Sequence, residues 1–440
     1  MSALAITGIG LFTPGGDGTA ATWERVLKGL PAATVTQVAG RAYLACPAPP
    51  FAPERLGAAR FRRLDRSAQF AHLAAEEAVR DAGLWGEAGR IAVQGGELSG
   101  APSRSAVQGG ELSAGPGRSA VQGAEFAVDP DRTAVLVGTG AGCVTAYDSH
   151  HETLRTTGAE RVSPFAVPSS LPNSIAAQLS ITLGAGGPST TVSTACASGA
   201  SALGLAADLL RLGRCDAAVV VGAEAILTPF HLAGFDRIAA LSHRLDDPAA
   251  ASRPFDAARD GFVAAEGAGA LVLERAGHAA ARGARVHARL LGHGSSSDAH
   301  NAVRPRADGH GIATAVRAAL TDAGITAADI GYVNAHATGT PVGDAVEARA
   351  LARLLPHRPP VSSTKGVTGH LFGAAGTVEA ALTALALRHR LLPPNTNLDH
   401  PSPDIDLDLP TAPRPHPATA ALSVSAGFGG HNAVLVLAPA

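Results

Sequence analysis

Residues 192–222 of the 440-residue chain read VSTACASGASALGLAADLLRLGRCDAAVVVG. The segment 200–214 is rich in Ala and Leu and predicts a helix, and the apolar run 217–222 predicts a buried strand directly after it. Cys196 stands at the turn into this helix. A helix that leads at once into an apolar strand is typical of α/β folds.

The same alternation of apolar strands and Ala-rich helices continues on both sides of this unit. Further strands are expected at residues 3–11, 133–137, 285–291, 330–334, 421–425 and 433–437, and further helices at 67–82, 312–323 and 377–387. This alternation predicts an α/β fold with largely buried strands. Because the chain exceeds the size at which one core stops growing, we expect two packed halves.

The composition narrows the possible classes of protein. A formal charge of −2 gives no basic field, so nucleic acid is not an expected partner. The four cysteines show no CxxC spacing, so neither a zinc site nor a disulfide framework is expected. The sequence has no secretory signal and no apolar run of the roughly 20 residues that span a bilayer. We therefore expect a cytoplasmic protein with no metal and no membrane contact.

One segment interrupts the alternation. Residues 91–104, 105–118 and 119–132 are three consecutive copies of a 14-residue unit built on AVQG. A short Gly- and Ser-rich period is compatible with a small solenoid, but three copies offer too little apolar surface to stack into a core. We interpret the segment near residues 91–127 as a mobile surface insertion produced by local duplication.

Cys196 and two histidines are the candidate reactive residues. At the start of a helix the dipole favours the thiolate of Cys196, and backbone N–H groups can hold an oxyanion. His336 lies in NAHATGTP (334–341), directly after an expected strand, and His370 lies in STKGVTGH (363–370), before an expected helix. Each residue alone would more often be structural. Together they lie in loops of the kind that carry ligand-binding residues in open α/β sheets.

These motifs resemble those of the β-ketoacyl-acyl-carrier-protein synthases, specifically the elongating type with one cysteine and two histidines. The similarity runs from ITGIG (6–10) to GFGGHN (427–432) and includes RPFD (253–256), RDGF (259–262) and GD at 343–344. The triple repeat falls outside it. The resemblance implies a thiolase-type fold with halves at residues 1–275 and 276–440, in five layers α-β-α-β-α.

The resemblance also implies a reaction. Cys196 would take an acyl group from a phosphopantetheine thioester. Malonyl-acyl carrier protein would then lose its carboxylate, and the carbanion would attack the Cys196 thioester to give a β-ketoacyl thioester. His336 and His370, as neutral N–H donors, would stabilise the charge that builds on the malonyl thioester oxygen. The pathway would be fatty-acid or type II polyketide elongation, with no cofactor other than the phosphopantetheine on the carrier protein.

Two further catalytic residues and a gate follow from the resemblance. Lys365 would pair with Glu347 beside the second histidine, although an ordinary partly buried ion pair is an alternative for Glu347. Phe428 would gate the acyl pocket and complete the oxyanion hole with its backbone N–H. Gly427 and Gly429 on either side would allow this turn to swing.

Other assignments concern substrate and partner binding. Phe262 would pack over the malonyl site, and Thr338 and Thr340 would bind the pantetheine arm; core packing and local loop hydrogen bonds are the alternatives. Arg62 and Arg63 fall where the family binds acidic carrier proteins, with a solvated helix face as the alternative. The family implies a homodimer, or a heterodimer with a subunit like a chain-length factor.

Four positions depart from the family pattern. Ala337 follows the first histidine and is a small change, and His431 stands where Thr is common. The arginine that usually precedes Ala-Leu-Ser is missing, and Arg237 is the candidate substitute. Tyr147 lies in the segment that sets pocket depth and is a candidate for reshaping the acyl tunnel.

Two other functions remain open. A non-catalytic partner subunit would have lost its nucleophile, so Cys196, His336 and His370 argue against that class. A cysteine-dependent acyltransferase or thioesterase that does not decarboxylate is also compatible with Cys196, but the two histidines and Phe262 argue against it.

Overall fold

The computed structural model describes residues 3–85 and 127–440. Residues 91–126, which we interpreted as part of a surface insertion, lie outside the described residues. The segments on either side of this part of the chain lie close together, because the Ala127 N–H donates to the Leu84 carbonyl (3.1 Å). A short 3-10 helix, Pro130–Arg132, then leads into the first parallel strand of the sheet.

Eleven strands of the described residues form one hydrogen-bonded sheet, in which two groups of five strands repeat one pairing pattern. In each group three parallel strands are followed by two antiparallel ones. The first group is, in spatial order, β6 (Ser189–Val192), β5 (Thr133–Gly138), β7 (Ala217–Glu224), β9 (Gly267–Arg275) and β1 (Leu4–Thr13). The second is β12 (Val361–Ser362), β11 (Tyr332–Asn334), β15 (Ala421–Gly427), β16 (His431–Pro439) and β10 (Ala288–Ser297). The groups join where β1 pairs with β10, and β2 (Gly16–Asp17) pairs with β1.

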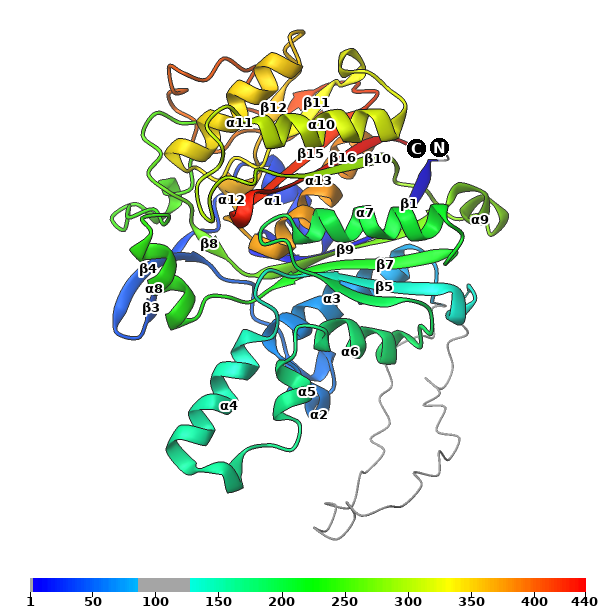
Figure 1. Ribbon diagram of the computed structural model, residues 1–440, viewed down its shortest axis with the longest axis vertical. Coiled ribbons are helices and arrows are strands. Elements are labelled where there is room, and N and C mark those ends of the chain that lie inside the picture. Colours follow the sequence, from blue (N-terminus) through cyan, green and yellow to red (C-terminus); the bar gives the residue numbers. More distant parts are fainter. Residues whose placement is uncertain (1–2, 86–126) are drawn as a thin grey trace.

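Helices cover both groups of strands and separate them (Figure 1). On the first group, α3 (Arg66–Asp81) and α6 (Ser174–Leu183) form the outer layer. On the second, α10 (His310–Ala323) packs on β10 and β16, with α11 (Pro341–Leu354) beside it. Between the groups lie α7 (Ser198–Arg211) and α13 (Ala375–His389), each in contact with strands of both. The fold is therefore α/β of the thiolase type, with layers α-β-α-β-α as expected.

The central helix α13 is buried on all sides and approaches α7 closely. Every residue of α13 from Ala375 to Leu387 is buried, as expected of a helix that is covered on all faces. A Cβ added to Gly376 would lie 2.3 Å from the Ala200 nitrogen, so only glycine allows this approach. The start of α7 is thereby held against the start of α13.

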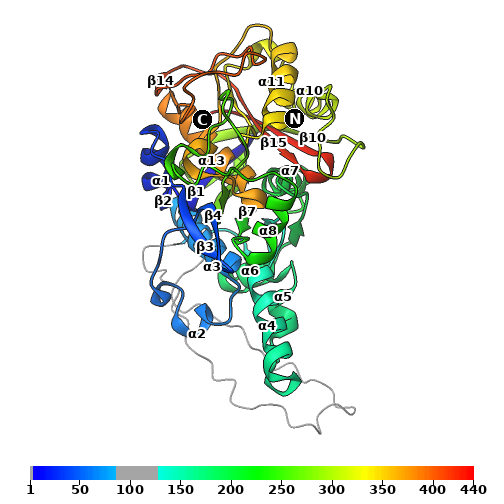
Figure 2. The same ribbon diagram turned by 90° about the vertical axis from the view of Figure 1, so that its left-hand side faces the viewer.

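The remaining elements complete the body and form a projection. They are α1 (Thr19–Leu27), β3 (Thr34–Val38), β4 (Arg41–Cys46), α2 (Ala58–Phe61), α4 (Val144–Thr157), α5 (Ala166–Ser170), α8 (Pro229–Arg237), β8 (Ala264–Ala265), α9 (Ala276–Ala281), α12 (Lys365–Thr368), β13 (Leu391–Leu392) and β14 (Arg414–Pro415). Figures 1 and 2 show α4 and α5 extending away from the layered body.

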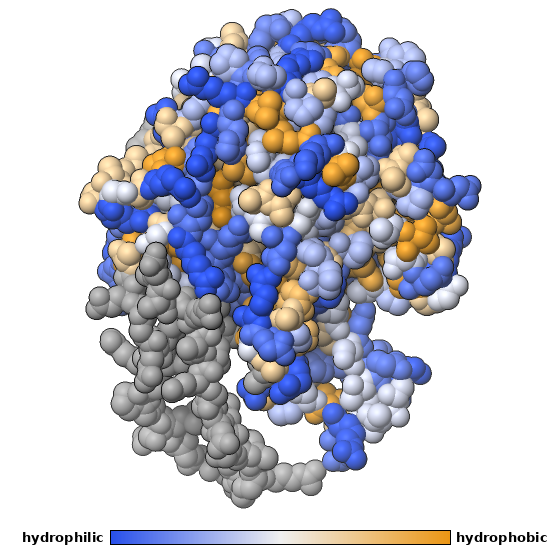
Figure 3. Space-filling model, turned by 180° about the vertical axis from the view of Figure 1, so that it is seen from behind, coloured by the Kyte–Doolittle hydropathy of each residue, from blue (hydrophilic) through white to orange (hydrophobic). Residues whose placement is uncertain are grey.

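The helix lengths show whether any described helix could span a membrane. Within residues 3–85 and 127–440, every helix is too short or too polar to cross a membrane. Figure 3 shows hydrophilic residues interspersed with hydrophobic ones on the face opposite to that of Figure 1.

Candidate active site

Cys196 lies in a tight turn two residues before α7, and its side chain is almost fully buried. Ala195 adopts a positive φ of 50°, which a non-glycine residue rarely does and which marks a sharp bend. The end of β15 closes over this turn: a Cβ on Gly427 would lie 2.8 Å from the Thr194 carbonyl oxygen. The backbone N–H groups of Phe428 and of Cys196 itself face the sulfur.

His336 and His370 line the same cavity as Cys196, which has a volume of about 380 Å³. His336 follows β11 and His370 follows α12, so both come from the second group of strands, whereas Cys196 comes from the first. The two imidazole rings lie edge to face with their centroids 5.3 Å apart. Other predicted residues that line the cavity are Phe262, Thr338, Thr340, Glu347, Gly427 and Phe428.

Both histidines are held in the neutral form. Burial lowers the pKa of His336 and of His370 well below the usual value, and the positive charge of Lys365 adds to this effect. The Nδ1 atoms of both rings are buried and have no hydrogen-bond partner among the described residues. Each ring thus presents one N–H donor and one acceptor nitrogen at the pH of most cells.

Burial also governs the thiol of Cys196. It raises the pKa of Cys196 to about 12, while the charge of Lys365 and the N–H of Phe428 act in the opposite direction. The expectation that the helix start favours the thiolate is therefore not met before substrate binds. The desolvation of the sulfur outweighs the favourable contacts at the turn.

The predicted pairing of Lys365 with Glu347 is wrong. Lys365, at the start of α12, forms a buried ion pair with Glu379 of α13. Glu347, on α11, instead accepts hydrogen bonds from the backbone N–H groups of His336 (2.8 Å) and Ala337 (2.7 Å). Glu347 faces the loop of the first histidine, so it positions that loop. Burial raises the pKa of Glu347 to about 7.

Sequence reasoning missed Glu379 as the partner of Lys365, although α13 contained a signal. Glu379 is the single charged residue in the otherwise apolar or small-residue segment 375–387. A carboxylate in a helix that is buried on all sides requires a cation or hydrogen-bond donors. The sequence leaves open which cation, because residues 14 positions apart on two different helices are joined only by the fold.

A second missed carboxylate, Glu224, lies at the end of β7. It is fully buried and accepts hydrogen bonds from the backbone N–H groups of Gly140 (2.7 Å), Ala141 (3.1 Å) and Gly373 (2.9 Å). Burial raises the pKa of Glu224 to about 7. Glu224 thus joins the loop after β5 to the loop after His370. Its signal was a charged residue at the end of an apolar strand.

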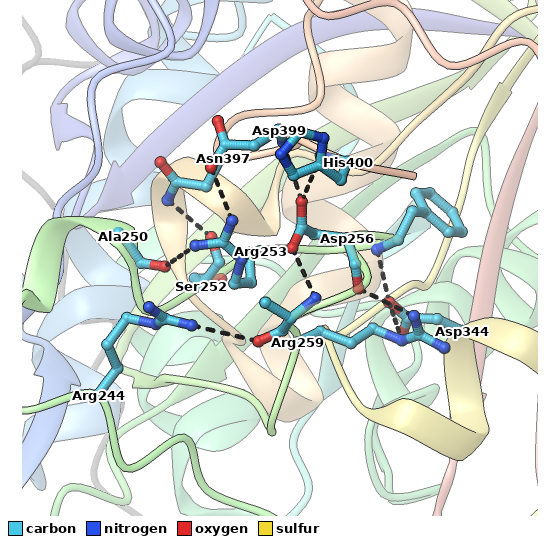
Figure 4. A network of polar contacts seen from close by, with 12 residues as sticks. Arg244, Ala250, Ser252, Arg253, Asp256, Arg259, Asp344, Asn397, Asp399 and His400 are labelled. Carbon is cyan, nitrogen blue, oxygen red and sulfur yellow. Dashed lines mark hydrogen bonds and ion pairs between the residues drawn. The ribbon is translucent and has the colours of Figure 1, made fainter. Parts of the chain in front are cut away.

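A polar network holds the loop that carries Thr338 and Thr340 (Figure 4). Asp344 is fully buried and accepts hydrogen bonds from the N–H groups of Gly339 (3.1 Å) and Phe255 (2.8 Å). Burial raises the pKa of Asp344 to about 6. In the same network Arg253 pairs with Asp256 (2.9 Å) and Asp399 (2.7 Å). Arg259 of the RDGF motif lies 3.8 Å from Asp344 and donates to the Thr340 carbonyl (3.3 Å), so the charged residues of both motifs support the loop behind the cavity wall.

Aromatic rings form one wall of the cavity. Phe262 meets the His370 ring edge to face at 5.4 Å, and Phe372 lies 4.5 Å from the same ring. Phe235 stacks on Phe372 at 5.0 Å and lies 6.3 Å from Phe428. Phe235 and Phe372 were not among the predicted site residues. Phe372 adopts a positive φ of 49°, which places its ring beside His370.

Several predicted residues lie outside this cavity. Arg62 and Arg63 are exposed between α2 and α3, and the Arg63 guanidinium lies 5.5 Å from the ring centre of Phe165. Gly429 has a φ of 80° in the turn after Phe428 but does not line the cavity. Arg237 is exposed at the end of α8, next to a residue that lines the cavity. The docking roles of the arginines stay predictions.

Two of the departures from the family pattern also lie elsewhere. Tyr147 is 59% exposed on α4 and stacks on His151, so within one subunit it does not shape the Cys196 cavity. His431 is exposed and lines a separate cleft beside α7 and β10.

Three buried side-chain oxygens come from β11, β15 and α13. Asn334, on β11, lies opposite Ser423, on β15, and the Asn334 amide group donates to the Glu379 carbonyl (3.4 Å). Asn334 Oδ1, Ser423 Oγ and Glu379 Oε2 have no hydrogen-bond partner within residues 3–85 and 127–440. Within the described part of the chain, no group of three or more His, Cys, Asp or Glu side chains is arranged to bind a metal.

Comparison with known proteins agrees with this geometry. The model of the beta-ketoacyl synthase N-terminal domain matches residues 118–279, and that of the C-terminal domain matches residues 287–399. A 3-oxoacyl-[acyl-carrier-protein] synthase 2 of Staphylococcus aureus is 38% identical over 98% of this chain and 99% of its own length. The synthase 2 of Vibrio cholerae is 47% identical, but the match spans 61% of this chain and 66% of the relative, just under two thirds.

Two solved structures share the fold over the whole chain. One is a type II polyketide synthase acyl carrier protein in complex with its ketosynthase bound to the hexaketide (28% identity, TM-score 0.83, 100% of this chain and 99% of that chain). The other is the ishigamide ketosynthase/chain length factor (28% identity, TM-score 0.82, 100% and 99%). With both domain models matched in order and a full-length relative at 38% identity, the chain belongs to the β-ketoacyl synthase family.

Proposed function

We propose that the chain catalyses the decarboxylative condensation of an acyl group held on Cys196 with a malonyl thioester. The observation that carries the proposal is the single cavity shared by Cys196, His336 and His370. A nucleophile that can hold an acyl chain there meets two neutral N–H donors suited to a developing oxyanion. The product is a β-ketoacyl thioester.

In the first half-reaction the Cys196 sulfur attacks the carbonyl carbon of the acyl thioester. A new bond forms to Sγ, the bond to the carrier sulfur breaks, and the carrier thiol leaves with the proton that Cys196 gives up. Because burial raises the pKa of Cys196, this proton must be removed as the acyl donor enters. The N–H groups of Phe428 and Cys196, which face the sulfur, would stabilise the oxyanion that forms beside it.

In the second half-reaction the malonyl thioester loses carbon dioxide. The electron pair of the broken C–C bond moves onto the thioester as an enolate, whose oxygen accepts hydrogen bonds from His336 and His370. The carbon of this enolate attacks the acyl carbonyl, and the Cys196 thiolate leaves. Phe262 and Phe372 line the cavity beside His370 and exclude water from the enolate.

The proposed substrates arrive on an acyl carrier protein. Support comes from the printed names of the relatives and from the solved complex of a ketosynthase with its carrier protein. Thr338 and Thr340 line the cavity and would bind the pantetheine arm; their hydroxyl oxygens lie 3.2 Å apart. The relatives include enzymes of both 3-oxoacyl and polyketide assembly, so we propose chain elongation in one of these two pathways.

We further propose that the chain works as a dimer. Strand β6 ends the strand order and pairs only with β5 among the described residues, which leaves one edge free to extend the sheet. Exposed apolar side chains lie nearby on α5 and α6, among them Val167 (69% exposed) and Ile181 (65% exposed). A second copy is the expected partner. A chain-length-factor subunit is the alternative, by similarity to the ishigamide complex.

Sequential addition of the two substrates tests the reaction. Acyl carrier protein thioester is added first and malonyl carrier protein second, while protein and product are followed by mass spectrometry. We expect a single acyl adduct on Cys196 and then a β-ketoacyl product. Both should be absent in Cys196→Ala and present in Cys215→Ala, which removes a buried thiol outside the cavity.

Other outcomes separate the alternatives. Acylation of Cys196 without chain extension would contradict condensation and indicate a non-decarboxylating acyltransferase. Acylation that occurs only after a second, chain-length-factor-like subunit is added would contradict the homodimer and indicate an obligate heterodimer.

A further inference from the structure

The charged side chains that line the Cys196 cavity differ in whether they have a hydrogen-bond or ion-pair partner. Asp298, Asp344 and Glu347 are buried, and each accepts hydrogen bonds from backbone N–H groups. Arg304 is the one arginine or lysine among the described residues that line the cavity. It is exposed, and its guanidinium has no ion-pair or hydrogen-bond partner in residues 3–85 and 127–440. Arg304 therefore presents an unused positive charge.

Local contacts hold Arg304 at this position. The Asn301 side-chain oxygen accepts a hydrogen bond from the Arg304 N–H (3.0 Å), and Pro305 restricts the backbone of the preceding residue to extended conformations. The same loop is joined to the turn after Phe428, because the Gly429 N–H donates to the Ala302 carbonyl (2.8 Å). The loop of Arg304 thus lies against the turn that closes over Cys196.

Exposure increases from one end of the cavity to the other. Cys196 is 8% exposed, whereas three apolar lining residues are well exposed: Ile238 (44%), Val303 (42%) and Val342 (55%). These three residues, together with Arg304, mark the mouth of the cavity. An occupant that reaches Cys196 from solvent passes this apolar mouth and Arg304.

We propose that Arg304 binds the phosphate of the phosphopantetheine arm. This inference rests on the proposed function, in which a thioester at the end of that arm reaches Cys196. The arm has one anionic group, a phosphate at the end opposite to the sulfur, so this group remains toward the mouth when the thioester is at the bottom. A planar guanidinium matches phosphate oxygens in charge and geometry. Arg304 is a positioning residue, which favours phosphorylated donors over uncharged ones.

The test compares two acyl donors that differ only in the phosphate: an acyl pantetheine thioester and the corresponding acyl 4′-phosphopantetheine thioester. The rate of Cys196 acylation is measured by mass spectrometry with the full chain and with Arg304→Ala. We expect Arg304→Ala to reduce kcat/KM about tenfold for the phosphorylated donor and to leave the other donor unchanged, since the bond is charge-assisted but exposed. Arg304→Lys should restore part of the preference.

Arg306→Ala is the matched control, because Arg306 pairs with Asp308 (2.9 Å) and does not line the cavity. It should leave both donors unchanged. Equal losses for both donors in Arg304→Ala, or no loss for either, would overturn the inference while leaving the proposed function intact. If the unmodified chain is acylated by neither donor nor by an acyl carrier protein, the proposed function itself is contradicted, and the role of Arg304 with it.

Discussion

Burial favours the neutral form of the three reactive side chains, Cys196, His336 and His370. It raises the pKa of the Cys196 thiol and lowers the pKa of His336 and of His370, because desolvation disfavours every charged form. These three side chains are therefore neutral before substrate binds. The negative charge of the enolate appears only during the reaction, where preorganised donors in a water-excluded site stabilise it most effectively.

The first prediction concerns the two donors. Replacing either His336 or His370 by Ala should slow carbon dioxide release from the malonyl thioester about 10²- to 10³-fold, as expected for the loss of one oxyanion donor. Acylation of Cys196 should be less affected, because its oxyanion is held by backbone N–H groups. His431→Ala is the control, since His431 lines a different cleft. Carbon dioxide release that is unchanged in both variants would contradict this role.

A second prediction concerns pH. Since the pKa of both histidines lies well below 6.5, decarboxylation should stay constant from pH 8 to pH 6.5 and fall only in more acidic solution. Below pH 6.5 these two histidines bind more protons in the unfolded chain than in the folded one. The contribution of the two histidines to the free energy of unfolding is therefore present above pH 6.5 and is lost as pH falls. Half-loss of the decarboxylation rate near pH 6.5 that persists in Glu347→Gln, which removes the other group that titrates beside His336, would show that the rings titrate as if exposed.

At the scale of the elements, the sequence indicated helices and strands well and their contacts poorly. The helices expected at 200–214 and 377–387 correspond to α7 (Ser198–Arg211) and α13 (Ala375–His389). The strand expected at 285–291 is β10 (Ala288–Ser297), whose second half, GHGSSS, has little strand character and is fixed by pairing with β16. Tertiary pairing overrides local preference there.

The Lys365 ion pair shows that contacts between elements are also poorly predicted from sequence at the site. The resemblance correctly drew attention to Lys365 but joined it to Glu347, whereas the ion pair links α12 to Glu379 of α13. Periodicity shows that α13 is apolar and that Glu379 needs a partner. It does not show which helix faces it, because that depends on how the layers pack.

The third prediction tests the contact between α7 and α13. Gly376→Ala would place a Cβ 2.3 Å from the Ala200 nitrogen, so the helices must separate and carry the Cys196 turn with them. We expect a loss of about 1–3 kcal/mol in the free energy of unfolding, as for other overpacked cores, and a lower rate of Cys196 acylation. Urea unfolding and mass spectrometry measure the two.

Gly277→Ala, in α9, is the matched control for that substitution. No atom lies within 4 Å of the added Cβ, so the variant should be as stable as the unmodified chain or slightly more stable, owing to the better helix propensity of alanine. Similar stability of both variants would contradict the close packing of α7 on α13.

At the scale of the molecule, the site lies between the two groups of strands. Cys196 comes from the first group, and His336 and His370 come from the second. Composition and periodicity predicted the α/β class, but neither brings residues 140 positions apart into one cavity. The family resemblance provided that juxtaposition. Glu224, Phe235 and Phe372 were missed because their roles depend on the packing of several loops around the cavity.

The fourth prediction concerns the repeat. Since Leu84 and Ala127 are hydrogen-bonded, residues 86–126 can be replaced by a short Gly-Ser link. The rate of Cys196 acylation should remain within about twofold of that of the unmodified chain. The free energy of unfolding should rise by up to about 2 kcal/mol, because a shorter loop costs less entropy to close. A scrambled segment of the same length is the control. Loss of folding or of acylation in the deletion would show that the segment contributes to the structure or the site.

A single-turnover experiment tests the central claim, that Cys196, His336 and His370 act on both substrates in one cavity. Protein acylated on Cys196 is freed of excess donor and mixed with malonyl carrier protein, and carbon dioxide, β-ketoacyl product and remaining acyl-Cys196 are counted together. We predict one carbon dioxide and one β-ketoacyl product for each acyl group lost from Cys196. Return of the acyl group to the carrier protein without extension, or release of carbon dioxide with acyl-Cys196 intact, would contradict it.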